Sequence, residues 1–146
     1  MVILGVDYGD MRTGLALCDR GGMLARPAGV ICEPGLDKTV KKIVDFALEN
    51  GVERIVVGLP KNMDGSRGER AQLCEKVARK VAGRLNATPI QVDLFDERQT
   101  TVSAIGILNE QNIRGKKRKE TVDAVAATLI LEAYLRRRKN EEVGER

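Results

Sequence analysis

Histidine and tryptophan are both absent from this chain of 146 residues, which also contains only two Phe, two Tyr and three Cys. Without histidine, the chain cannot build a Ser-His-Asp triad, a Cys-His nucleophile, an HExxH zinc site or a Cys/His zinc finger. So few aromatic rings provide little surface on which unpaired bases could stack. Any catalysis must therefore depend on carboxylates, bound metal, lysine or cysteine.

The cysteines and the apolar segments exclude further classes. Cys18, Cys32 and Cys74 lie far apart, so no CxxC pair is available for a zinc ribbon or a thioredoxin-type motif. We expect reduced thiols that act as small apolar side chains. The N-terminus lacks the basic segment of a signal peptide, and the longest apolar run, 124–131, is too short to cross a membrane. These features predict a soluble, cytoplasmic protein.

Nine of the 25 basic residues fall in two clusters, and the rest of the chain carries 16 basic residues against 21 acids. Such patches attract polyanions, and we expect the first cluster to contact nucleic acid or another phosphate-rich ligand. The second cluster fits either that role or a solvated helix end that the helix dipole favours. The first cluster consists of Arg114, Lys116, Lys117, Arg118 and Lys119, and the second of Arg136, Arg137, Arg138 and Lys139.

Periodicity predicts the order of the secondary structure. Three apolar segments separated by short glycine-rich turns predict an antiparallel meander in the N-terminal third. The continuous apolar run 54–59 predicts a strand that is buried on both faces. We expect strands over 2–8, 15–18, 23–32, 54–59 and 89–95, helices over 36–50, 69–85, 100–109 and 121–138, a loop over 60–68 and a basic loop over 111–120.

This order predicts a single α/β domain over residues 1–138, followed by a charged tail over 139–146. Its sheet should be mixed and five-stranded, with the first three strands antiparallel. The fourth and fifth strands follow helical crossovers, so they should run parallel to the first strand.

Acidic residues at three places in the chain are candidates for a shared site. Asp7 lies near the end of the first strand, and Asp96 and Glu97 follow the fifth. Ligands of open α/β sheets bind beyond the carboxyl ends of parallel strands. Asp123 lies among small apolar residues in the last helix, where it has either a functional role or a structural one in the first helical turn, beside an N-cap at Thr121.

If Asp7, Glu97 and Asp123 converge, their repulsion must be compensated. Two like charges about 4 Å apart repel by about 4 kcal/mol at an effective dielectric constant of 20. Hard carboxylate oxygens without His or Cys ligands favour Mg²⁺ or Mn²⁺ over Zn²⁺. Two such ions can activate water and stabilise the leaving oxygen in phosphodiester cleavage, with no side-chain base required.

Two loops at the same edge offer possible phosphate contacts. In the turn after Asp7, two glycines allow close approach of the backbone to an anion, and Arg12 and Thr13 could touch a phosphate. A plain tight turn explains the same residues. Lys61 and Asn62 offer donors in the loop after the fourth strand, where a simple solvated loop is the alternative.

Four sequence blocks resemble the bacterial YqgF family of pre-16S rRNA nucleases and Holliday-junction resolvase-like proteins. The blocks, which cover nearly the whole chain in the family's order, are VDYGDMRTGLALCD, IVVGLPKNMDGS, DERQTT and TVDAVAATLILEAYL. The resemblance implies an RNase H-like fold. It also implies that Asp7, Glu97 and Asp123 are the catalytic, metal-binding carboxylates. Asp10 departs from the Thr or Ser of many relatives and is left out of this set, while Arg98 resembles a residue that orients substrate or pairs with a carboxylate.

The resulting hypothesis is a Mg²⁺- or Mn²⁺-dependent nuclease that processes the 5′ end of pre-16S rRNA, as a monomer or a homodimer. Water would be the nucleophile. The substrate backbone would be bound by four basic side chains, those of Lys116, Lys117, Arg118 and Lys119. One alternative is a resolvase of four-way DNA junctions, which needs two active sites and therefore a dimer. Others are a nucleic-acid-binding module without catalysis and an ATPase of the actin and sugar-kinase type, which needs two such domains.

Overall fold

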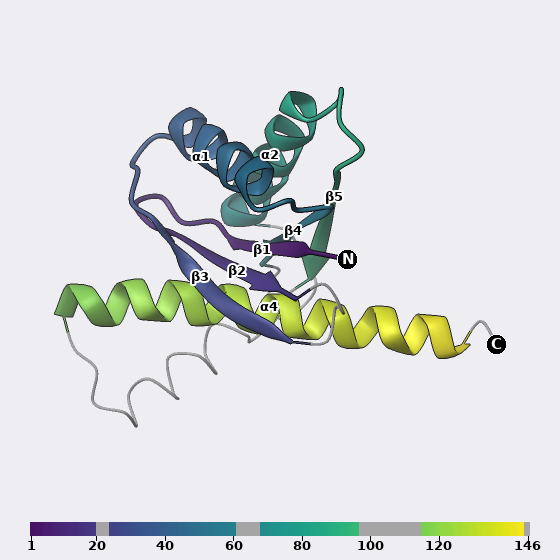
Figure 1. The fold of residues 1–146 in the computed structure, drawn as a ribbon. Helices are drawn as coiled ribbons and strands as arrows, with labels where there is room; N and C mark the ends of the chain where they lie inside the picture. Colours follow the sequence, from purple (N-terminus) through teal and green to yellow (C-terminus); the bar gives the residue numbers. More distant parts are fainter. Residues whose placement is uncertain (20–23, 61–67, 97–114, 145–146) are drawn as a thin grey trace.

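The computed structural model describes residues 1–19, 24–60, 68–96 and 115–144, and, within the last of these ranges, the side chains of 123–139. The expected helix over 100–109 lies outside the described residues. The described elements form one five-stranded mixed sheet between two helical layers (Figure 1). They are β1 (Ile3–Asp7), β2 (Thr13–Cys18), β3 (Ala25–Ile31), α1 (Leu36–Glu49), β4 (Arg54–Leu59), α2 (Glu69–Arg84), β5 (Gln91–Asp96) and α4 (Gly115–Gly144).

The strand order, β3-β2-β1-β4-β5, confirms the predicted α/β fold. β1 pairs antiparallel with β2, and β2 pairs antiparallel with β3, because each pair is joined by a short turn. β4 lies parallel to β1, and β5 lies parallel to β4, since a helix separates each strand from the previous one. The carboxyl ends of β1, β4 and β5 therefore lie at the same edge of the sheet.

The larger core lies between the sheet and the pair α1 and α2. Leu4 and Val6 of β1 point to this side, where they pack with buried residues such as Ile43 of α1 and Val77 of α2. Helical spacing of the apolar residues produces this packing, because it gives each helix one buried face. Two cysteines, Cys18 and Cys74, are buried as expected, whereas Cys32 is exposed.

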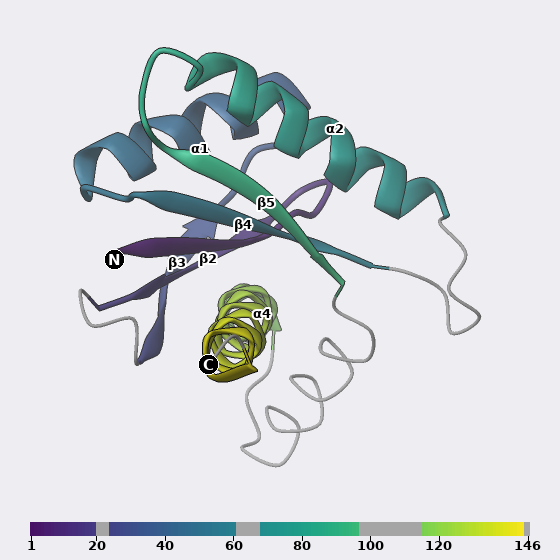
Figure 2. The same cartoon turned by 90° about the vertical axis from the view of Figure 1, so that its right-hand side faces the viewer.

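α4 covers the opposite face of the sheet, as the view along its axis shows (Figure 2). Its contact with the sheet depends on small residues. A Cβ atom added to Gly5 of β1 would lie 3.0 Å from the Cβ of Leu131 and 3.1 Å from the carbonyl oxygen of Ala127. Any larger side chain at position 5 would push the helix away from the sheet.

The expected boundaries of the last helix are wrong. α4 begins at Gly115 and not at Thr121, so the expected basic loop is helical from that point, and the helix continues past Arg138 to Gly144. Lys, Arg and Glu are favourable helix residues and extend it in both directions. Asp123 consequently lies more than two turns inside the helix, where the dipole of the N-terminus has little effect.

None of the helices in the described part of the chain is both long and apolar enough to cross a bilayer.

Candidate active site at the carboxyl edge of the sheet

Asp7 is the last residue of β1, and its side chain lies on the face of the sheet that α4 covers. Successive side chains of a strand alternate between faces. In β1, Ile3 packs in the cluster on the α4 side, whereas Leu4 and Val6 pack against α1 and α2. The alternation places Asp7 with Ile3, at the carboxyl edge and under the helix.

Gly14 brings Asp123 to the same place. Gly14 of β2 is the register partner of Asp7, and a Cβ atom added to it would collide with the backbone carbonyl of Asp123. Only glycine allows α4 to approach β2 this closely. The first and last described elements of the chain therefore meet at the Asp7–Gly14 pair, with a carboxylate on each side.

Electrostatics at Asp7 reflect this crowding. The pKa of Asp7 is raised from 3.8 to about 7, first by burial of the carboxyl group and, to a smaller extent, by the negative charge of Asp123. The positive charge of Arg70 acts in the opposite direction and lowers this pKa. A cation placed between the two carboxylates would oppose the upward shift of this pKa, because it would stabilise the charged form.

Two arginines flank the carboxylates. The Nε atom of Arg12 lies 3.3 Å from the Oδ2 atom of Asp123, in an ion pair whose side chains are 32% and 25% exposed. On the other side, Nη2 of Arg70 donates a hydrogen bond of 2.6 Å to the backbone carbonyl of Tyr8. The structure thus combines two acids with two guanidinium groups, an arrangement suited to binding a phosphate beside a cation.

Arg70 was not predicted from the sequence. It lies in the first turn of α2, which follows the loop at the carboxyl end of β4, so its position in the chain already places it near this edge. The direction of its side chain depends on the packing of α2 against the sheet. The spacing of apolar residues in α2 does not reveal that direction.

The turn between β1 and β2 contains hydrogen bonds between its own residues. The backbone N–H of Gly9 donates to the hydroxyl of Thr13, which in turn donates to the carbonyl of Gly9, both at 3.4 Å. Thr13 is buried, and a Cβ atom on Gly9 would collide with the carbonyl of Arg12. These contacts form a tight turn, and the phosphate contact predicted for Thr13 stays a prediction. Asp10 is exposed at its tip.

Several predicted site residues lie outside the described residues, namely Glu97, Arg98, Lys61 and Asn62. The backbone of the segment with Lys116, Lys117, Arg118 and Lys119 belongs to α4, but the positions of these side chains are not described. Asp96, immediately before Glu97, is the last residue of β5 and pairs in register with Leu59 at the end of β4. Among the described residues, no group of three acids, cysteines or histidines is placed to hold a metal.

The donors that the structure does bring together fit Mg²⁺ or Mn²⁺. Asp7 and Asp123 provide hard carboxylate oxygens only, which suit these ions better than Zn²⁺. Burial and the charge of Asp123 raise the pKa of Asp7 even with Arg70 in place, so added positive charge beside this carboxylate would favour its ionised form. A divalent cation would supply that charge.

Comparisons with known proteins identify the family of the chain. The family model described as "RuvX: Holliday junction resolvase" matches residues 1–137. A protein of Pelotomaculum thermopropionicum named "Putative pre-16S rRNA nuclease" is 40% identical over 136 residues, which cover 92% of this chain and 86% of that protein. A protein of Halothermothrix orenii with the same name is 42% identical over 135 residues, covering 92% and 94%.

Solved structures with the same fold include two resolvases. The structure of Thermus thermophilus RuvC aligns with a TM-score of 0.56 and 17% identity, over 95% of this chain and 97% of that one. The fowlpox virus Holliday junction resolvase aligns with a TM-score of 0.59 and 9% identity, over 93% and 98%. At these identities the two structures establish the fold alone. The family model and the relatives that are about 40% identical show that the chain belongs to the RuvX/YqgF family of nucleases, enzymes that hydrolyse phosphodiester bonds.

Proposed function

We propose that this chain is a metal-dependent endonuclease that processes the 5′ end of pre-16S rRNA in the cytoplasm, with Asp7, Glu97 and Asp123 as its catalytic carboxylates. The observation that carries the proposal is the meeting of Asp7 and Asp123 at the Gly14 contact, where burial and mutual repulsion raise the pKa of Asp7 to about 7. The names of relatives about 40% identical to the chain support the choice of substrate.

In this proposal, each residue has a distinct task. Asp7, Asp123 and Glu97 hold Mg²⁺ or Mn²⁺, which when bound activates water and stabilises the charge that develops on the phosphate. Arg12 fixes the orientation of the Asp123 carboxylate through their ion pair. Arg70 holds the backbone at Tyr8 and adds positive charge beside Asp7. Lys61, Asn62, Arg98 and the basic residues 116–119 are proposed to bind the substrate.

A second candidate function is the resolution of four-way DNA junctions. The description of the matching family model favours it, and one solved structure of the same fold is titled as a complex of T. thermophilus RuvC with a Holliday junction substrate. Symmetric cutting of a junction requires two active sites, so this candidate predicts a homodimer, whereas processing of one RNA end is compatible with a monomer.

The test is cleavage of a 5′-extended small-subunit rRNA precursor in Mg²⁺ or Mn²⁺ by wild type, Asp7→Asn and Glu97→Gln. Asp37→Asn is the matched control, because Asp37 is an exposed acid of α1 that pairs with Lys80, on the other side of the sheet. Wild type and the control should cut the RNA, and both site variants should not.

Other outcomes separate the alternatives. Cleavage of a four-way junction but not of the precursor RNA would support the resolvase. Binding of either nucleic acid without cleavage in any metal would indicate a module without catalysis. Equal cleavage by Asp7→Asn and wild type would show that the active site lies elsewhere.

A further inference from the structure

A second concave surface lies on the α4 side of the sheet, remote from the end of β1. It has a volume of about 310 Å³ and is bounded by the start of β4, by β5 and by the C-terminal half of α4. We call it the Arg137 pocket. Three guanidinium groups and one carboxylate contribute to it, so its net charge is positive; the residues used below are Arg54, Asp93, Phe95, Tyr134, Arg137 and Arg138.

The floor of the pocket is a closed polar network. Nη1 of Arg54 donates to Oδ2 of Asp93 at 2.9 Å and to the hydroxyl of Tyr134 at 2.7 Å. The Tyr134 hydroxyl donates to the same Asp93 oxygen at 2.8 Å. Arg54 is therefore the cation that pairs with this carboxylate, and the residues that line the pocket carry a net positive charge.

The rim consists of two arginines whose positions are partly fixed. The guanidinium carbon of Arg137 lies 5.8 Å from the centre of the Phe95 ring, and that ring packs edge-on against Tyr134 at 5.9 Å. Nη1 of Arg138 lies 3.3 Å from the sulfur of Met1. A cation held over an aromatic face loses less conformational entropy when it binds an anion. Because Arg137 covers the face of Phe95, the pocket suits a phosphate better than a stacked base.

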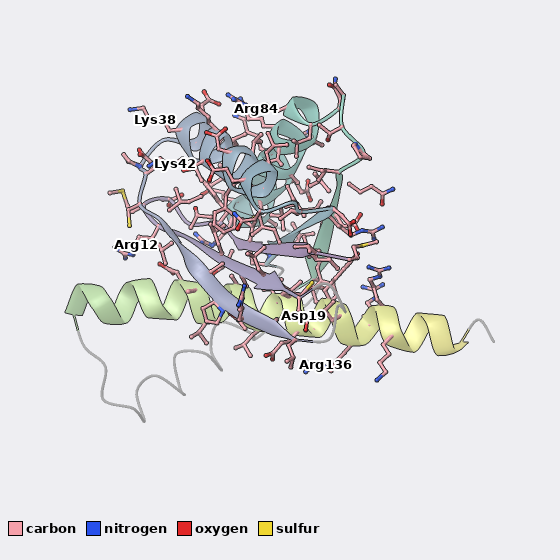
Figure 3. All side chains as sticks on the ribbon, in the orientation of Figure 1. Arg12, Asp19, Lys38, Lys42, Arg84 and Arg136 are labelled. Carbon is pink, nitrogen blue, oxygen red and sulfur yellow. The ribbon has the colours of Figure 1, made fainter. Side chains whose placement is uncertain are left out.

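The pocket and the candidate active site are connected by one continuous helix. Arg137 follows Asp123 by 14 residues in α4, which corresponds to about 21 Å along the helix axis. That length equals about six steps at the 3.4 Å rise of B-form DNA, and slightly more at the smaller rise of A-form RNA. In Figure 3, Arg12 lies near the N-terminal half of α4 and Arg136 lies in its C-terminal half.

We propose that the Arg137 pocket binds the sugar-phosphate backbone of the nucleic-acid substrate about six nucleotides from the cleaved bond. This inference rests on the proposed nuclease function and extends it. It assigns the second basic cluster to substrate binding through Arg137 and Arg138. The site would add affinity and register without sequence specificity, because phosphates carry no base information.

The test measures RNA binding by fluorescence anisotropy in EDTA with wild type and the double variant Arg137→Gln/Arg138→Gln. The matched control, Arg79→Gln/Arg84→Gln, removes the same charge from exposed positions of α2, in the helix layer across the sheet (Figure 3). The probe is a duplex RNA of roughly 20 base pairs, which is long enough to reach from the active site to the Arg137 pocket in either direction along the duplex. Circular dichroism melting of each variant verifies the fold.

The expected result follows from counterion release. Each lost phosphate contact lowers the salt slope by about 0.9, so the pocket variant should lose about 1.8 units. Between about 50 and 200 mM salt, the affinity of wild type should then fall roughly tenfold more than that of the variant. The variant should also raise KM for cleavage without changing kcat, whereas Arg137→Lys/Arg138→Lys should keep the wild-type slope.

Three results would overturn the proposal or separate it from the nuclease function. Equal salt slopes for the pocket variant and the α2 control, with wild type still cutting RNA, would refute the pocket alone. Unchanged RNA affinity together with lost binding of polyglutamate would assign the pocket to an acidic protein instead. Absence of both cleavage and RNA binding in wild type would refute the proposed function itself.

Discussion

Replacing Asp7 with asparagine should stabilise the protein at neutral pH while it abolishes cleavage. The substitution keeps the shape of the side chain and removes a charge that the fold holds in an unfavourable place. The pKa of Asp7 is about 7 in the folded chain, against 3.8 as its ordinary value, mainly because the carboxyl group is buried. Folding is therefore disfavoured whenever this group has to be ionised.

The sign and size of the effect follow from proton linkage. Below pH 3.8 the carboxyl group is protonated in both the folded and the unfolded chain, so it has no effect on stability. Between pH 3.8 and about 7 the unfolded chain loses the proton while the folded chain keeps it, and the free energy of unfolding falls. Above pH 7 the loss is constant at about 4 kcal/mol, since each pKa unit corresponds to about 1.4 kcal/mol.

The assay is urea denaturation of wild type and Asp7→Asn in EDTA at pH 5 and pH 8. The advantage of the variant in free energy of unfolding should grow by about 3 kcal/mol between these two values. Added Mg²⁺ should stabilise wild type more than the variant, because the substitution removes one of the three carboxylates that are proposed to hold the ion. An advantage that is the same at both pH values would refute the claim that Asp7 is ionised at a cost in the fold.

Three further substitutions test other contacts of the structure. Gly14→Ala should destabilise the chain by about 1–3 kcal/mol in urea denaturation, because its Cβ collides with the α4 backbone; wild-type stability would contradict that close approach. Tyr134→Phe should cost about 1 kcal/mol by the same assay, since it removes the hydrogen bond with Arg54, and a stabilised variant would argue against the network. Arg70→Gln should shift the acidic limb of the pH–rate profile to higher pH, because it removes the charge that lowers the pKa of Asp7; an unshifted limb would show that the two groups do not interact.

Much of the fold was predictable because its signals are local. The run 54–59 is buried on the α1 and α2 side and on the α4 side, and it gives the strand β4 with the predicted bounds. The helical spacing from Leu36 likewise gives α1 with an end one residue before the predicted stop. The helical crossover connections then make β4 and β5 parallel to β1, and this places the ends of β1 and β5 at one edge.

The last helix shows where local signals are insufficient. The basic run 114–119 contains no apolar residue, so periodicity gives no helical signal there, although lysine and arginine have high helix propensity. The structure places Gly115–Glu120 in α4. Since Asp123 then lies away from the helix N-terminus, its ion pair with Arg12 replaces the dipole as its stabilising contact.

The candidate site was predictable only as a set of residue types at one edge. Asp7 and Asp123 are far apart in the sequence, and their meeting depends on Gly14, whose missing side chain has no local signature. Arg70 illustrates the same limit, because its contact with Tyr8 depends on how α2 packs on the sheet. Tertiary packing therefore decides which of the predicted polar residues share a site.

The most direct test of the central claim is the cleavage rate of Asp7→Asn, Asp123→Asn and the double variant on precursor rRNA in Mn²⁺. Residues that act as one catalytic unit are strongly non-additive, so the double variant should be no slower than either single variant. All three should show only background cleavage, while Asp37→Asn keeps the wild-type rate. Losses that multiply in the double variant, or a rate near wild type for Asp123→Asn, would contradict a shared site at the carboxyl edge of the sheet.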